Sequence, residues 1–146
     1  MLRKLCEFKV CKKDLIQIYI LYIRSIVEQS CVVWASALTE QQKTDIERVQ
    51  KISLRIILRE DYRTYMNALQ VTQLPSLSER RDKLMLNFAL KCVKNDKTSK
   101  MFPKNSPRKT RSIEIYKIPH ANTERLKKSA IPTMARLLNE NANKLK

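Results

Sequence analysis

The side chains best suited to metal binding or nucleophilic chemistry are few in this chain and lie far apart. There are four cysteines, Cys6, Cys11, Cys31 and Cys92, and a single histidine, His120. Structural zinc sites need four ligands and usually pair them two to four residues apart, a spacing that these cysteines lack. One histidine also limits acid–base catalysis, because histidine is the usual proton-transfer residue. We therefore expect reduced thiols in an intracellular protein, with no metal and no cofactor.

Basic side chains point to a different chemistry, the binding of a polyanion. The chain carries 30 Lys and Arg against 14 Asp and Glu, a net charge of +16. Arg48, Lys51, Arg55 and Arg59 recur at steps of three and four residues, which places them on one face of a helix. Binding of a polyanion there would release counterions. The alternative is an ordinary amphipathic helix with a solvated face.

A second helix repeats this spacing with Arg80, Lys83, Asn87 and Lys91. Beside them, Leu77, Leu84, Phe88 and Cys92 are predicted to form an apolar face, just as Ile46, Val49, Ile56 and Ile57 do opposite the first basic face. Two helices with parallel basic faces predict one electropositive surface.

Residues 97–111 form a basic segment with two prolines and little apolar surface. Its candidate nucleic-acid-binding cations are Lys100, Lys104, Arg108, Lys109 and Arg111. Phe102 or Tyr116 is available to stack on bases. The segment has too few apolar residues to offset its ordering entropy, so it also fits a solvated linker with a nuclear-localisation role. The two interpretations are compatible.

Arg81 falls on the apolar face of its helix, next to Leu77 and Leu84. A buried arginine needs a carboxylate or several carbonyl partners, so we predict an ion pair with Glu28 or Glu47. The alternative is that its guanidinium reaches the rim of the core. Trp34 is expected in an apolar patch that it shares with Tyr22.

Helices must position these side chains, because the chain has no glycine for hairpin turns or phosphate-binding loops. Helices are expected over about residues 2–9, 14–34, 39–59, 62–70, 77–94 and from 129 onward. Asp14, Thr39 with Gln42, and Ser76 with Glu79 supply their N-terminal caps. We expect an irregularity near Ser30.

The predicted fold class is all-α, a small bundle of four to five helices with an extended basic tail that ends in a short helix. Residues 1–94 form the helical domain, 95–128 a basic linker with prolines, and 129–146 the C-terminal helix. Residues 1–94 hold 17 basic and 10 acidic side chains, and residues 95–146 hold 13 and 4. The apolar run over residues 15–23 is too short to span a bilayer, so no membrane partner is expected.

An ordered series of short motifs carries a resemblance to a known family. The series comprises Arg24-Ser25-Ile26-Val27-Glu28, Val33-Trp34, Ile46-Glu47-Arg48-Val49-Gln50-Lys51, Tyr65-x-x-Ala68-Leu69, Leu74-Pro75-Ser76-Leu77 and Glu79-Arg80-Arg81. It resembles the thumb and post-thumb region that follows the palm in reverse transcriptases of non-LTR retrotransposons of the jockey type. Residues 123–139 are similar to the C-terminal end of such proteins. The resemblance implies a thumb that grips the template–primer duplex by its backbone.

The chain departs from that family at the active site. A reverse transcriptase needs paired palm aspartates to hold two divalent ions, and no such pair occurs here; Glu60-Asp61 is the only adjacent acidic pair. We therefore expect no enzyme activity from this chain, but binding to the backbone of RNA or DNA inside the cell, in the nucleus. The alternative is a protein–protein interaction module whose apolar surface docks a reverse-transcriptase palm domain or a second copy.

Overall fold

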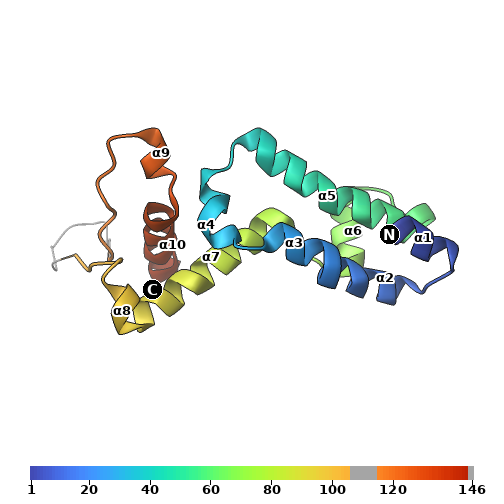
Figure 1. Ribbon diagram of the computed structural model, residues 1–146, viewed down its shortest axis with the longest axis horizontal. Coiled ribbons are helices and arrows are strands. Elements are labelled where there is room, and N and C mark those ends of the chain that lie inside the picture. Colours follow the sequence, from blue (N-terminus) through green and yellow to red (C-terminus); the bar gives the residue numbers. More distant parts are fainter. Residues whose placement is uncertain (106–114, 145–146) are drawn as a thin grey trace. The chain divides into compact units, whose positions relative to one another are not determined.

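The computed structural model describes residues 1–105 and 115–144. The regular secondary-structure elements of these residues are all helices (Figure 1). The helices are α1 (Leu2–Glu7), α2 (Lys12–Ile18), the π-helix η1 (Tyr19–Arg24), α3 (Ser25–Glu28), α4 (Cys31–Trp34), η2 (Ala35–Ala37), α5 (Glu40–Leu58), η3 (Arg59–Asp61), α6 (Tyr65–Thr72), α7 (Leu77–Lys94), α8 (Asp96–Ser99), α9 (Glu124–Lys127) and α10 (Ala130–Lys144). In the described residues, β-structure is limited to one isolated bridge between Lys104 and Tyr116. The predicted all-α class is confirmed.

The chain divides into two compact units, each built from two separate segments. Unit 1 comprises Met1–Gln29 and Leu38–Arg80, and unit 2 comprises Ser30–Ala37 and Arg81–Lys146. This division differs from the predicted boundary after residue 94. The physical reason is that α7 contributes core side chains to unit 2, where residues beyond 94 complete the same core.

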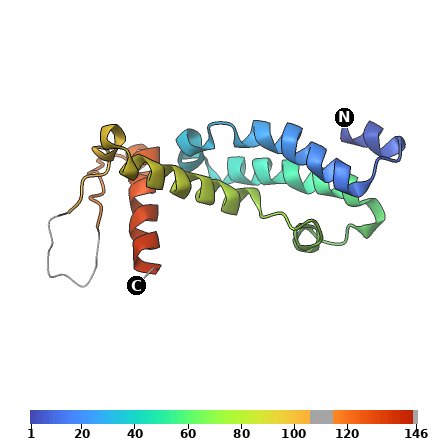
Figure 2. The same ribbon diagram turned by 90° about the horizontal axis from the view of Figure 1, so that it is seen from below.

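Unit 1 is organised around the long helix α5, against which α1 and α2 pack (Figures 1 and 2). Its main core cluster contains Leu2, Cys6, Leu15, Tyr19 and Ile57, and a second cluster under α6 contains Leu54, Leu58 and Ala68. The predicted capping box is present, since Thr39 Oγ1 accepts from Gln42 N–H at 3.3 Å and Gln42 Oε1 accepts from Thr39 N–H at 3.0 Å. Of the predicted apolar face, Ile57 is buried, whereas Val49 is 38% exposed.

Unit 2 has its own core. Its buried side chains are Cys31, Ala35, Met85, Ala89, Cys92, Phe102, Met134, Ala135 and Leu138, with Trp34 and Tyr116 packed against them. Phe102 thus belongs to the core, so residues 95–128 are more than a solvated linker. Phe88, predicted on the apolar face of α7, is 45% exposed; Met85 and Ala89 take that role.

A polar clamp, formed by Tyr116 and Asn139, fastens the segment that begins at residue 115 to α10. Buried Asn139 accepts from Tyr116 N–H at 2.9 Å and donates to Tyr116 C=O at 3.0 Å. Residues 103–105 also pair with residues 115–117, because Asn105 N–H donates to Ile115 C=O and Lys117 N–H donates to Pro103 C=O. Residues 105 and 115 are therefore held close together.

Several helix ends use left-handed backbone without glycine. Lys9, Ser30 and Gln73 have φ near +55°, and Arg59 has φ 50° with ψ −112°. Gln73 ends α6 in a Schellman arrangement, in which Leu74 N–H donates to Leu69 C=O at 3.0 Å. The irregularity predicted near Ser30 is confirmed. The predicted cap at Asp14 is wrong, since α2 begins one turn earlier, where Cys11 Sγ accepts from Asp14 N–H.

Candidate nucleic-acid interface

The basic face predicted over residues 48–59 is solvent-exposed, but only its first three cations lie on α5, because that helix ends at Leu58 and Arg59 begins η3 with a positive φ. Arg48, Lys51, Arg55 and Arg59 are all exposed, while Gln50, Leu54 and Leu58 of α5 are buried. The α-helical period explains this division, because steps of three and four residues return to the same face. Arg55 stacks over Tyr62, with its guanidinium carbon 5.5 Å from the ring centroid, and this contact orients the side chain.

Within residues 1–105 and 115–144, no ion pair joins these four cations to a carboxylate. The ion pairs among the described residues are Lys12–Asp61, Arg24–Glu28, Lys43–Glu40, Arg80–Glu28 and Lys127–Glu124. None of these pairs includes a member of the α5 basic face. An exposed and uncompensated row of cations is the arrangement that attracts phosphates.

The basic face of α7 is shorter than predicted. Lys83, Asn87 and Lys91 are exposed, as the spacing requires. Arg80 instead donates from Nε to Glu28 Oε1 at 2.5 Å, and its side chain is only 32% exposed. Arg80 is therefore removed from the candidate phosphate-binding set, because its charge is already compensated. Whether the faces of α5 and α7 form one surface stays a prediction.

The candidate cations of the basic segment fall into two groups. Lys100 and Lys104 are exposed, and Lys104 forms the isolated bridge with Tyr116. Arg108, Lys109 and Arg111 lie outside the described residues. The prediction that Phe102 is available to stack on bases is wrong, because its ring is 4% exposed and packs in the core of unit 2.

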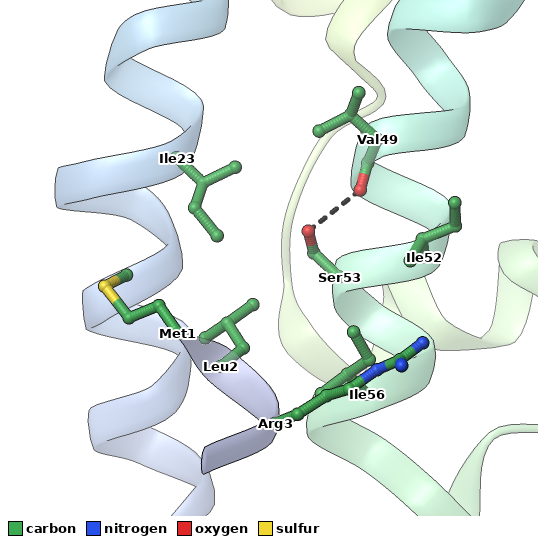
Figure 3. A pocket seen from close by; sticks show the side chains of 8 residues that line it. All are labelled: Met1, Leu2, Arg3, Ile23, Val49, Ile52, Ser53 and Ile56. Carbon is green, nitrogen blue, oxygen red and sulfur yellow. Dashed lines mark hydrogen bonds between the residues drawn. The ribbon is translucent and has the colours of Figure 1, made fainter. Parts of the chain in front are cut away.

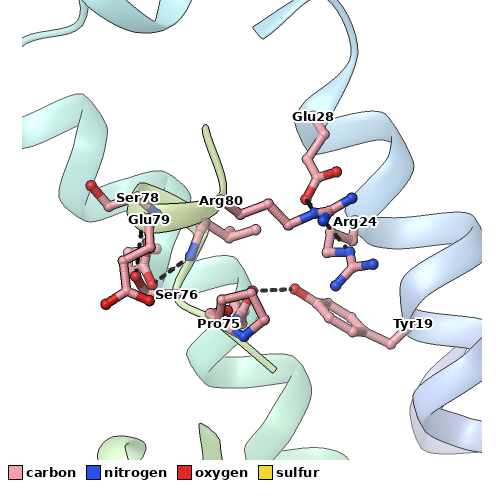
Figure 4. Close-up of polar contacts among 11 residues, drawn as sticks. Tyr19, Arg24, Glu28, Pro75, Ser76, Ser78, Glu79 and Arg80 are labelled. Atoms are coloured by element: carbon pink, nitrogen blue, oxygen red, sulfur yellow. Dashed lines mark hydrogen bonds and ion pairs between the residues drawn. The ribbon is translucent and has the colours of Figure 1, made fainter. Parts of the chain in front are cut away.

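Glu28 lies between two arginines in unit 1 (Figure 4). Its Oε1 accepts from Arg80 Nε at 2.5 Å and lies 3.5 Å from Arg24 Nε. The prediction that Glu28 pairs with Arg81 is therefore wrong by one residue. Arg81 itself is buried, as its helical phase predicts, but in the described part of the chain it forms no ion pair, and its Nη1 atom has no hydrogen-bond partner.

Glu47, the second predicted partner of Arg81, instead binds the start of α7. Its Oε1 accepts from the Tyr65 hydroxyl and from Leu77 N–H at 3.1 Å, and its Oε2 accepts from Ser78 N–H at 3.2 Å. Ser76 Oγ accepts from Glu79 N–H at 3.2 Å, which is the hydroxyl half of the predicted capping box. The first three free amides of α7 are thus all satisfied. Two of them bond to a carboxylate, whose negative charge also interacts favourably with the positive N-terminal end of the helix dipole.

A second polar chain joins the same elements. The buried Tyr19 hydroxyl donates to Gln50 Oε1 at 2.8 Å, and Gln50 Nε2 donates to Pro75 C=O at 2.9 Å. Burial raises the pKa of Tyr19 well above its usual value, and burial together with the bond to Glu47 does the same to the pKa of Tyr65. These tyrosines stay protonated donors to Gln50 and Glu47 of α5, and those two α5 side chains in turn bond to Pro75 and to the start of α7 within unit 1.

The comparisons with known proteins identify no relative. No protein-family model matches this chain, and neither does a curated protein or a solved structure. Among the described residues, no three His, Cys, Asp or Glu side chains are grouped to hold a metal ion. No single described helix is long and apolar enough to cross a membrane; one bent pair, Lys12–Glu28 with Cys31–Ala37, reaches that length and composition.

Two features of unit 1 escaped the sequence argument, namely the Glu47 contacts and an apolar groove beside α5. Val49, Ile52 and Ile56 line that groove, and their spacing of three and four residues is a helical signal. The predicted apolar face includes Val49 and Ile56 but not Ile52. Of the predicted patch, Tyr22 is exposed, whereas Trp34 is partly buried against the core of unit 2.

Proposed function

We propose that this chain binds the backbone of a nucleic-acid duplex without catalysis, in the nucleus. In this proposal it corresponds to the C-terminal region of a retrotransposon RNA-directed DNA polymerase, and its ligand is a template–primer duplex. The exposed face of α5 provides the contacts, with Lys83, Lys91, Lys100 and Lys104 as further cations.

The observation that carries the proposal is the uncompensated row of Arg48, Lys51, Arg55 and Arg59. Carboxylates neutralise other cations of unit 1, including Lys12, Lys43 and Arg80, but no carboxylate in the described part of the chain pairs with these four. A row of point charges on a rigid helix follows a phosphate backbone without reading bases, because base readout needs contacts to base edges in a groove. We therefore expect little sequence preference.

The test is fluorescence anisotropy of a labelled RNA–DNA hybrid, titrated with the full chain at a series of salt concentrations. Affinity should fall linearly with log salt. The double variant Arg48→Gln/Lys51→Gln should lower the steepness of that line by about 1.8, at about 0.9 per neutralised phosphate contact. Lys43→Gln is the matched control, because Lys43 lies on the same helix but pairs with Glu40 at 2.7 Å.

Two results would overturn the proposal. One is the absence of binding at low salt by a sample whose circular dichroism shows a folded helical protein. The other is an effect of the double variant no larger than twice that of the Lys43 control, since the double variant removes two charges and the control one; that result would assign the binding to net charge rather than to this face of α5.

A further inference from the structure

Unit 1 contains an open apolar groove between η1 and α5, closed at one end by α1 (Figure 3). Its volume is about 430 Å³, and its lining residues are Met1, Leu2, Arg3, Ile23, Val49, Ile52, Ser53 and Ile56. This volume is within the range of about 300–1,000 Å³ that is typical of ligand pockets. Figure 3 shows Ile23 and Leu2 pointing into the space in front of α5.

The groove exposes apolar side chains that a folded protein normally covers. Ile52 is 45% exposed, and Val49 is 38% exposed. Ser53 adds little polarity, because its hydroxyl donates to Val49 C=O at 2.8 Å within α5. The groove therefore offers a partner almost only apolar contacts.

The charges around the groove are mainly positive. Arg3 lies in its lining, and Arg48 and Arg55 flank Ile52 at the i−4 and i+3 positions of α5. Of the acidic residues nearby in the sequence, Asp45 lies one turn before Val49 on α5, and Glu60 lies in η3, beyond the end of that helix. Asp45 also accepts a hydrogen bond from Gln41 at 3.1 Å.

We propose that this groove docks an acidic amphipathic helix of a partner protein. Apolar side chains of that helix, spaced at i, i+3, i+4 and i+7, would fill the groove between Ile23 and Ile52. Its acidic side chains would face Arg3, Arg48 and Arg55. A second copy of this chain fits poorly, because a net charge of +16 would bring the same arginines against each other. Arg48 and Arg55 also belong to the proposed nucleic-acid-binding face, so an acidic helix and a duplex would compete for them, whereas the apolar contacts with Ile23 and Ile52 belong to the groove alone.

The probes are three labelled helical peptides, and the protein is the full chain. The first peptide has leucine at the four contact positions and glutamate on its flanks. The second replaces each glutamate with lysine, and the third scrambles the acidic sequence. We expect anisotropy to report binding of the first peptide alone, and Ile52→Ser to weaken it about tenfold, equivalent to about 1.4 kcal/mol. Arg3→Gln should also weaken binding of the acidic peptide.

Met66→Ser is the matched control, because Met66 is 67% exposed in unit 1 but lies outside the groove. Equal losses for Ile52→Ser and Met66→Ser would overturn the proposal, as would equal binding of the acidic and basic peptides or no binding by the folded chain. Self-association that Ile52→Ser abolishes would replace the proposed partner with a second copy. Ile52→Ser should leave RNA–DNA hybrid affinity unchanged, so failure of the groove and failure of the basic face are separate results.

Discussion

Replacing Glu47 with glutamine should destabilise unit 1 by disrupting the start of α7. The variant keeps an oxygen in the position that accepts from Tyr65 and Leu77, but places an amide NH₂ opposite Ser78 N–H. One accepted hydrogen bond is lost, which costs about 1–1.5 kcal/mol. The negative charge at the helix N-terminus is also lost, at about 0.5–1 kcal/mol. We therefore expect a decrease of about 2 kcal/mol in the free energy of unfolding.

The assay is urea unfolding followed by circular dichroism, with Glu79→Gln as the control. Glu79 lies in the first turn of the same helix and is exposed, so its replacement reports the dipole term alone, about 0.3–1 kcal/mol. A second readout is the tyrosinate absorbance. Because the Glu47 carboxylate is one cause of the raised pKa of Tyr65, Glu47→Gln should lower that pKa.

Equal losses of unfolding free energy for Glu47→Gln and Glu79→Gln would refute the role assigned to Glu47. That role is equally refuted if tyrosine ionisation is unchanged by Glu47→Gln, since Tyr65 would then not be bonded to this carboxylate.

Three further changes test the fold. Gln73→Gly should stabilise the protein by about 1 kcal/mol in urea unfolding, because glycine removes the strain of left-handed backbone; Gln70→Gly, inside α6, should instead cost about 1 kcal/mol. Asn139→Ala should cost about 2–3 kcal/mol, since both backbone groups of Tyr116 lose their partner, and a loss below 0.5 kcal/mol would contradict the clamp. The free energy of unfolding should fall above pH 10, because the folded state keeps the Tyr65 proton to higher pH than the unfolded state does. In the unfolded state the pKa of this tyrosine is near 10, so its contribution to stability is present below pH 10 and is lost as the pH rises. Tyr65→Phe should make the fall shallower.

The long helices were predictable because their signals are local. The bounds of α7, Leu77–Lys94, follow from the serine cap after Pro75 and from an apolar repeat of period 3.6. The burial of Arg81 follows from the same period. Exposure of the α5 basic face was predictable for the same reason, since it depends only on position around one helix.

Contacts between segments distant in the sequence were not predictable. Glu28 and Glu47 are each separated from α7 by 30 or more residues, so the choice between Arg80 and Arg81 depends on how helices pack rather than on spacing. Phe102 stands alone in a basic, proline-containing segment without periodicity, and no sequence signal distinguishes a core anchor there from a base-stacking ring.

The interleaving of the two units has a consequence for the order of folding during synthesis. Cys31 and Ala35 are made early, but they pack with Met134 and Leu138 of α10, about one hundred residues later. Unit 1 has all of its residues once Arg80 has left the ribosome, whereas the core of unit 2 stays open until α10 emerges. Contacts of such sequence separation form slowly, and the uncovered segment is exposed to aggregation meanwhile. A ribosome stalled before α10 should therefore carry a chain with unit 1 protected from protease and residues 30–37 accessible to it.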